Sequence, residues 1–144
     1  MEAIIPYLTF EGNARQALDF YCGALNGEVL YLQTFGETQV GAQVAPDWKD
    51  KVMHAAFQAD NLQIMVSDTM SDTHKVKAGD QVNLSLNFNT EQEIDHVFGA
   101  LAEGAEVTMP LETTFWGAKF GMLTDKFGIR WMFNHDLKQE NKEG

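Results

Sequence analysis

The alternation of apolar and polar side chains predicts the same set of elements twice along the chain. In the first round, strands are predicted over residues 4–10, 28–35, 52–59 and 62–67, with an amphipathic helix over residues 14–25. In the second round, strands are predicted over residues 82–89, 106–109, 118–124 and 129–134, with a helix over residues 91–102. Asn13 and Thr90 precede the two helices and are residue types that cap helix N-termini. The predicted order is therefore β-α-β-β-β, repeated once.

The two predicted helices also share sequence at matching positions. Both contain the pattern Asp-x-x-x-Gly-Ala-Leu, which ends at Leu25 in the first helix and at Leu101 in the second. A glycine inside a helix costs about 1 kcal/mol relative to alanine, so Gly23 and Gly99 predict close packing of each helix on its sheet. One module alone would leave a face of its sheet uncovered, and two modules are expected to bury those faces together.

The repeat predicts a single domain over residues 1–144 with four parts. Module one spans residues 1–70, a polar connector spans 71–81, module two spans 82–135, and a frayed polar tail spans 136–144. Residues 36–51 have little periodicity and are predicted to form a long loop, which suits a lid or a partner contact. Asp60, Asp125 and Gly128 are predicted turn residues, and Pro110 is predicted to end the strand over residues 106–109.

Composition excludes several classes of function. Ten Lys and Arg residues against 21 Asp and Glu residues give a net charge of −11, which disfavours binding to nucleic acid or anionic lipid. No apolar run approaches the roughly 18–20 residues of a membrane span, and no basic segment precedes the first strand, as a signal peptide would require. Cys22 is the single cysteine, so no internal disulfide is expected and a reducing compartment fits. The predicted location is the cytoplasm.

Eight short segments along nearly the whole chain carry a resemblance to a known family. They are YLTFEGNA at residues 7–14, ALDFY at 17–21, MHA at 53–55, MVSD at 65–68, MPL at 109–111 and, most specific, FWG at 115–117, DKFG at 125–128 and WMFN at 131–134. In these segments the chain resembles the PhnB-like branch of the vicinal oxygen chelate superfamily, also labelled 3-demethylubiquinone-9 3-methyltransferase-like. The superfamily includes glyoxalases, bleomycin-resistance proteins and extradiol dioxygenases. The resemblance implies an α+β fold of duplicated βαβββ modules, with cupped mixed sheets around a cavity and helices on the outer faces.

The resemblance also implies where a metal site would lie. Metal enzymes of this superfamily draw His, Glu and sometimes Gln ligands from the first, fourth, fifth and eighth strands. In this chain those positions fall near Ile5 and on Met65, Asn83 and Met132. Divalent metal ions of this kind prefer oxygen or imidazole donors, and none of these residues is His or Glu. We therefore expect no metal and no cofactor.

Strand alternation also predicts which of these side chains face the cavity. Arg130, Met132 and Asn134 are expected to face the cavity, while Trp131 and Phe133 are expected to pack in the core. Trp116 lies beside Gly117 in a loop, where an indole at the cavity mouth would supply stacking area and a hydrogen-bond donor. The predicted ligand-binding cavity comprises aromatic, thioether and neutral polar side chains: Tyr7, His54, Met65, Asn83, Trp116, Phe120 and Met132.

Of the four histidines, His54 is the strongest functional candidate, and its alternative is a half-buried histidine that bonds a neighbour. His74 and His135 lie in polar segments and are predicted to be solvated. Asp68 follows a predicted strand and is either functional or an ordinary turn residue.

The predicted function is that of a metal-free small-molecule-binding protein, like the bleomycin-resistance type. A metal-dependent lyase, isomerase or dioxygenase with a non-standard site is the first alternative. A methyltransferase is suggested by the family label alone, since the chain lacks the glycine-rich turn and parallel βαβ order that commonly bind the adenosyl cofactor. A structural or partner-binding dimer is a further alternative, and the expected partners are a small-molecule ligand and a second copy of the chain, with no nucleic acid and no membrane.

Overall fold

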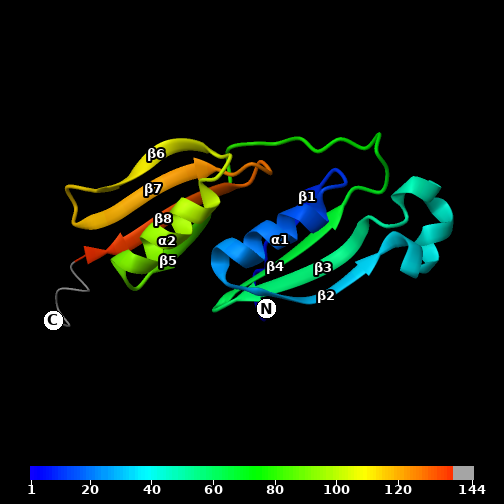
Figure 1. The fold of residues 1–144 in the computed structure, drawn as a ribbon, viewed down its shortest axis with the longest axis horizontal. Helices are drawn as coiled ribbons and strands as arrows, with labels where there is room; N and C mark the ends of the chain where they lie inside the picture. The colour runs from blue at the N-terminus through cyan, green and yellow to red at the C-terminus, as the bar shows by residue number, and fades with distance from the viewer. Residues whose placement is uncertain (138–144) are drawn as a thin grey trace. The chain divides into compact units, whose positions relative to one another are not determined.

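The computed structural model describes residues 1–137, so seven residues of the predicted tail lie outside the described part of the chain. The chain divides into two compact units, Met1–Lys77 and Ala78–Gly144. Each unit contains one four-stranded sheet with one helix packed across a face of it (Figure 1).

In unit 1 the elements are β1 (Tyr7–Phe10), α1 (Ala14–Leu25), β2 (Glu28–Thr34), β3 (Val52–Ala59) and β4 (Leu62–Asp68). The strand order is β1-β4-β3-β2, with β1 parallel to β4 and the other pairs antiparallel. The apolar stripe of α1 is buried at Leu18 and Tyr21, and the ring of Tyr21 stacks on Phe57 with centroids 6.0 Å apart. The predicted helical stripe is confirmed.

Unit 2 has the same order of elements: β5 (Leu84–Phe88), α2 (Glu91–Leu101), β6 (Glu106–Thr113), β7 (Ala118–Thr124) and β8 (Arg130–Asp136). Its strand order is β5-β8-β7-β6, again with one parallel pair, β5 with β8. Trp131 and Phe133 are fully buried on the helix side, as predicted. Two mixed sheets with the same topology confirm the α+β fold with a duplicated βαβββ module.

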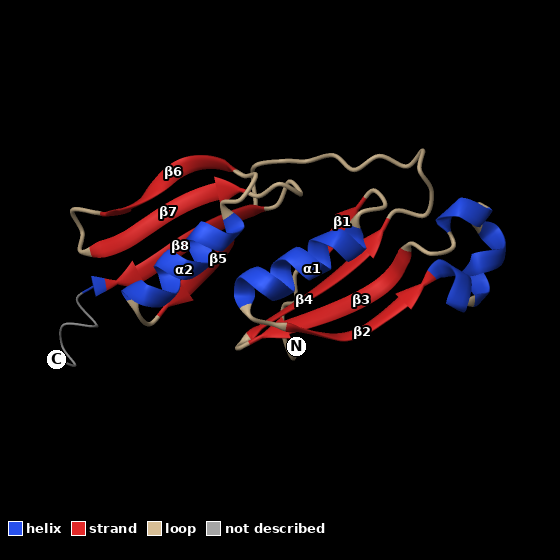
Figure 2. Cartoon of the chain, viewed as in Figure 1, coloured by secondary structure: helices blue, strands red, loops and turns tan. Residues whose placement is uncertain are grey.

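The segment between β2 and β3 is more ordered than its sequence predicts. It contains three 3-10 helices, Phe35–Glu37, Gln39–Gln43 and Pro46–Trp48 (Figure 2). Phe35, Val44 and Trp48 form a small core of their own, and the Trp48 indole nitrogen donates to the Thr69 carbonyl oxygen at 2.7 Å. The prediction of an irregular loop is wrong because three widely spaced apolar residues suffice to order the segment without producing a periodic pattern.

Several predicted element ends are also corrected. The first strand begins at Tyr7, three residues later than predicted, and β8 continues to Asp136, which was predicted to lie in the tail. Pro110 does not end β6, which runs on to Thr113. The strand tolerates a residue without an N–H group because β6 lies at the sheet edge and its pairing with β7 is irregular between Met109 and Glu112.

The helix N-termini are held in two different ways. The Thr90 hydroxyl oxygen accepts a hydrogen bond from the Glu93 amide at 3.1 Å, which confirms the predicted cap of α2. The Asn13 side chain makes no capping bond, so the predicted cap of α1 is wrong. The Asp68 carboxylate performs that role instead, accepting from the Ala14 amide at 2.9 Å. A cap contributed by a distant strand leaves no local sequence signal.

The helical glycines do not mark close packing. A Cβ built on Gly23 or on Gly99 meets no atom within 4 Å. Both glycines therefore lie beside open space, and the prediction of close helix-to-sheet contact at these points is wrong.

Candidate functional site

Each sheet has one face covered by its helix and one face that the helix leaves free, which we call the helix-free face. In unit 1, strand register places Tyr7 opposite Met65, Met65 opposite Ala56, and Ala56 opposite Tyr31. Residues directly opposite on neighbouring strands share a face, and His54, two positions from Ala56, lies on that face too. The structure therefore brings together three of the predicted site residues, Tyr7, His54 and Met65.

His54 is the centre of a hydrogen-bonded cluster on this face. Its Nδ1 lies 3.1 Å from the hydroxyl oxygen of Tyr7, and its Nε2 lies 2.6 Å from the hydroxyl oxygen of Tyr31. The Tyr7 ring stacks on the imidazole with centroids 5.6 Å apart and planes at 15°, and the Tyr31 ring is tilted against it at 5.2 Å. The two phenols remain 49% and 41% exposed. We call these three residues the Tyr-His-Tyr cluster.

Tyr31 is the member of this cluster that the candidate set omitted. Its strand, β2, departs from regular pairing between Val29 and Tyr31, so strict alternation along β2 does not decide its face. The sequence feature that could have identified Tyr31 is its residue type. A tyrosine on the strand next to the one that carries a histidine can bring its hydroxyl within reach of the imidazole.

In unit 2, methionines dominate the helix-free face. Register places Met132 opposite Met122 and Met122 opposite Met109, so three thioethers cross three neighbouring strands in one row. Met132 was a predicted site residue, and the other two were missed because each appears as a single methionine in its own strand. Ser85 lies opposite Met132 at the β5 end of the row. This row is flexible, polarisable apolar surface, which adapts to ligands of varied shape.

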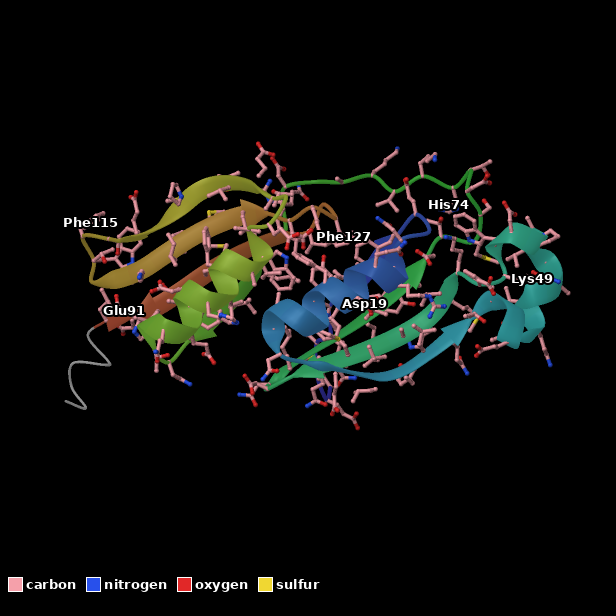
Figure 3. The ribbon with its side chains drawn as sticks, in the orientation of Figure 1. Asp19, Lys49, His74, Glu91, Phe115 and Phe127 are labelled. Atoms are coloured by element: carbon pink, nitrogen blue, oxygen red, sulfur yellow. The ribbon has the colours of Figure 1, made fainter. Side chains whose placement is uncertain are left out.

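The remaining predicted residues of unit 2 border this row. Phe120 is two residues before Met122 in β7 and therefore lies on the same face. Its ring meets the Trp116 indole edge-on, with the ring centroids 6.2 Å apart. Trp116 is 49% exposed in the turn between β6 and β7, beside Phe115, which is 97% exposed (Figure 3). Asn83 precedes β5, and its side-chain oxygen accepts from Arg130 Nε at 3.1 Å. Asn83 therefore lies beside the start of β8, whereas Phe120 lies opposite Asn134 near its end, next to Trp116. The four predicted residues of unit 2 are spread along the sheet and do not form one cluster.

Other predicted roles are corrected by burial. His135 is 2% exposed in β8, with its Nδ1 2.9 Å from the Phe88 carbonyl oxygen, so the prediction of a solvated side chain is wrong. Asp125 is buried in the turn before β8, where its carboxylate accepts from the Phe127 amide and from the Trp131 indole, both at 2.8 Å. Its predicted turn role is confirmed, and it also anchors the largest core side chain.

The side chains on these faces are poor ligands for a divalent metal ion. Among residues 1–137, no group of three His, Cys, Asp or Glu side chains could hold one. Burial first, and the charge of Asp19 second, raise the pKa of the Cys22 thiol, so that at neutral pH this cysteine is a protonated thiol and a weak nucleophile. The arrangement offers hydrogen-bonding hydroxyls, an imidazole, aromatic rings and thioethers, which are groups that bind organic molecules.

Comparison with known proteins places the chain in a family. The family model described as 3-demethylubiquinone-9 3-methyltransferase matches residues 2–133. The chain belongs to this family. Protein YjdN of Escherichia coli (strain K12) is 34% identical to it over 139 residues, covering 90% of this chain and 92% of that protein.

Solved structures agree with the assignment to the 3-demethylubiquinone-9 3-methyltransferase family. Protein PA1353 from Pseudomonas aeruginosa is 39% identical, with a TM-score of 0.82 and coverage of 94% of this chain and 98% of that one. The PhnB protein from Bacillus cereus is 28% identical, with a TM-score of 0.78 and coverage of 93% and 99%. A glyoxalase/bleomycin resistance protein/dioxygenase family enzyme from Burkholderia phytofirmans PsJN, at 15% identity, a TM-score of 0.59 and coverage of 94% and 100%, shares the fold. The predicted PhnB-like, 3-demethylubiquinone-9 3-methyltransferase-like branch is therefore confirmed, and the predicted glyoxalase/bleomycin resistance fold with it.

The part of the chain that the structure describes contains no helix long and apolar enough to cross a membrane.

Proposed function

We propose that this member of the family is a small-molecule-binding protein that works without a metal ion and takes its ligand on the helix-free faces. The observation that carries the proposal is the Tyr-His-Tyr cluster. Two large rings stand half exposed on a sheet face, and hydrogen bonds to His54 fix both of them. Rings held in place before binding lose little conformational entropy when a ligand stacks on them, so the cluster is suited to recognition.

The magnitude of binding follows from the available apolar surface. A ligand that covers about 200 Å² of ring and thioether surface gains about 5 kcal/mol at 25 cal/mol per Å². Loss of translational and rotational freedom offsets much of this gain. Apolar contact alone therefore gives weak binding, and hydrogen bonds from Tyr7 and Tyr31 must supply the remaining affinity and the specificity.

Independence from metal is supported by the residue types at the superfamily's ligand positions. Met65 and Met132 are thioethers and Asn83 is a neutral amide already bonded to Arg130. Soft thioethers are poor partners for the hard divalent ions that these enzymes use. Elemental analysis of protein purified without chelator tests this point, and a stoichiometric transition metal would refute it.

A thermal-shift screen tests ligand binding itself. A ligand present at 100 times its Kd stabilises the folded state by about 2.7 kcal/mol, which is readily seen as a rise in Tm. We expect planar aromatic compounds to raise the Tm of the wild-type protein and to raise that of Tyr31→Ala much less. Tyr31→Phe keeps the ring and removes only the hydroxyl, so its Tm shift should lie between those of wild type and Tyr31→Ala. A broad aromatic panel that shifts no melting curve would contradict the proposal.

Methyl transfer is a second candidate, because the matching family model bears a methyltransferase description. The usual adenosyl-cofactor fold has a mostly parallel sheet. In each described sheet of this chain only the first and last strands along the sequence pair in parallel, β1 with β4 and β5 with β8. The described strands therefore argue against that fold. Calorimetry with S-adenosylmethionine decides the matter. Saturable binding would favour the methyltransferase, and its absence favours the binding protein.

The proposal includes a homodimer located in the cytoplasm. The superfamily resemblance supports pairing, and a single cysteine fits a reducing compartment. Sedimentation of the purified protein at micromolar concentration measures the association state, and a monomer there would contradict the dimer.

A further inference from the structure

The hydrogen atoms of the Tyr-His-Tyr cluster can be assigned from its two distances. A neutral imidazole donates from one ring nitrogen and accepts at the other. Hydrogen bonds donated by O–H groups are shorter than those donated by N–H groups. The 2.6 Å contact therefore has Tyr31 donating to Nε2, and the 3.1 Å contact has Nδ1–H donating to Tyr7. In this arrangement the Tyr31 oxygen keeps lone pairs for an incoming O–H group.

We infer that the cluster binds a hydroxyaromatic ligand as its oxyanion and holds the ligand's proton on His54; this inference rests on the proposed binding function. The ligand O–H gives its proton to the Tyr31 oxygen while Tyr31 passes its own proton to Nε2. One O–H bond breaks and one forms at Tyr31, and the ligand oxygen keeps the electron pair of its broken bond. His54 gains one N–H bond and one positive charge, so the total charge does not change.

The protonated state matches a bound anion better than the neutral state does. With both ring nitrogens protonated, His54 donates to both phenol oxygens. Both phenol hydrogens are then directed away from the imidazole, and Tyr31 donates to the ligand oxyanion. Tyr7 keeps the free donor that it already has in the neutral state, and this donor can bond a second acceptor atom on the ligand. Hydrogen bonds to a charged acceptor are roughly twice as strong as neutral ones, so the transfer strengthens the contact.

Within the sheet of unit 1, the positions next to His54 carry no charged side chain. The neighbours of His54 on this face are Tyr7 from β1, Tyr31 and the directly opposite Gln33 from β2, and Met65 and Ser67 from β4. All are uncharged, and α1 packs against the opposite face. Among strands β1 to β4, the one carboxylate on this face belongs to Glu28, opposite Gln58, four residues along β3 from His54. The ligand oxyanion is therefore the near counter-charge for the imidazolium.

This chemistry selects a class of ligand. A plain phenol holds its proton far more tightly than an imidazole does, so transfer to His54 requires a phenol or enol made more acidic by an electron-withdrawing group. The ring of such a ligand can stack beside the exposed tyrosine faces, with Met65 opposite Tyr7 as apolar floor. The inferred ligands are acidic hydroxyaromatic compounds rather than hydrocarbons or sugars.

para-Nitrophenol is a direct probe because its ionised form absorbs visible light and its neutral form does not. At half a pH unit below its pKa, about a quarter of the free probe is ionised. We expect wild-type protein to bind the probe and to produce a visible phenolate band beyond that of the free probe under these conditions. His54→Gln keeps one acceptor and one donor for the two phenols but cannot take a proton. This variant should lose the band and bind the probe at least tenfold more weakly.

para-Nitrotoluene is the matched control ligand, since it has the same ring without an acidic hydrogen. It should bind wild type and His54→Gln within twofold of each other, measured by calorimetry. Tyr31→Phe provides a second variant that keeps the ring and removes the relay oxygen, and it should also lose the band.

The outcomes separate the inference from the proposed function. Probe bound by wild type with only the neutral spectrum would overturn the inference and leave the binding function standing, as would a phenolate band that persists in both variants. Failure of both nitroaromatics to bind would overturn the two together.

Discussion

Replacement of Asp68 tests whether one buried carboxylate organises unit 1. Its Oδ1 accepts from the Gly12 amide at 2.8 Å and from the Ala14 amide at 2.9 Å, and its Oδ2 accepts from the Val52 amide at 2.9 Å. The side chain is 4% exposed at the end of β4. It thereby joins the end of β4 to the start of α1 and the start of β3.

The magnitude can be worked from these three bonds. A hydrogen bond to a charged group contributes about 1.5–3 kcal/mol, so three of them would give about 4.5–9 kcal/mol if nothing replaced them. A pocket of about 130 Å³, lined in part by Gly12, Val52 and Asp68, lets water reach some of the released amides. We expect Asp68→Ala to lower the free energy of unfolding by about 3–5 kcal/mol. Asp68→Asn should lower it by about 2–3 kcal/mol, since its NH₂ group faces an amide donor.

Urea denaturation followed by far-UV circular dichroism measures the effect. With an m-value of about 1–3 kcal/mol per M, Asp68→Ala should move the midpoint down by more than about 1 M without changing m. Amide hydrogen exchange at Gly12, Ala14 and Val52 should accelerate together. Asp19→Asn, on the exposed side of α1 (Figure 3), is the control and should stay within about 0.5 kcal/mol of wild type. An Asp68→Asn protein as stable as this control would refute the reasoning.

Three further predictions concern the helices. Gly23→Ala and Gly99→Ala should each stabilise the protein by about 0.5–1 kcal/mol, seen as a higher Tm, because open space surrounds both positions; a lower Tm would contradict this. Thr90→Ala should cost about 1 kcal/mol in urea denaturation through loss of the α2 cap, whereas Thr90→Ser should not. The hydrogen bond to Asp95 raises the pKa of Lys119, so this pair stabilises the fold below the ordinary lysine value of 10.5, and that stability is lost as pH rises through the raised pKa. Asp95→Asn should reduce this alkaline loss, leaving the smaller contribution of Glu91, and an unchanged pH profile would count against the pairing.

The fold was predictable because its signals are local and are repeated. The alternation that gives β7 the bounds Ala118–Thr124 lies entirely within those residues, and so does the stripe that buries Leu18 and Tyr21. The repeat then adds independent support, since the same order of elements is specified twice.

The features that could not be predicted depend on residues far apart in the sequence. Asp68 caps a helix that begins 54 residues earlier, so neither its own neighbours nor those of Asn13 indicate the bond. Trp48 is ordered by a carbonyl 21 residues away. Pro110 ends a strand in most contexts, and only its place at a sheet edge permits β6 to continue.

The candidate site shows the same division between local and distant information. Strand parity alone places Met65 and Met132 on the helix-free faces, so type and face were both available from the sequence. His54 gains its special character only from Tyr7, 47 residues away, and Tyr31, 23 residues away. A histidine on a strand is usually structural, and here two phenols fix both of its nitrogens while leaving the rings half exposed.

The duplicated backbone therefore carries two different chemistries. In unit 1 the helix-free face presents hydroxyls and an imidazole, groups that can exchange protons with a ligand. In unit 2 the corresponding face presents the row of Met109, Met122 and Met132, which can only supply adaptable apolar contact. Since both sheets have the same strand order, this difference cannot come from the backbone. The difference lies in a few side chains on the helix-free faces, which can vary because they do not form the core. If ligand specificity is concentrated in unit 1, Met132→Leu should change the affinity for acidic and for non-acidic aromatic ligands by the same factor. Substitutions of His54 should instead weaken the binding of acidic ligands more than that of non-acidic ones.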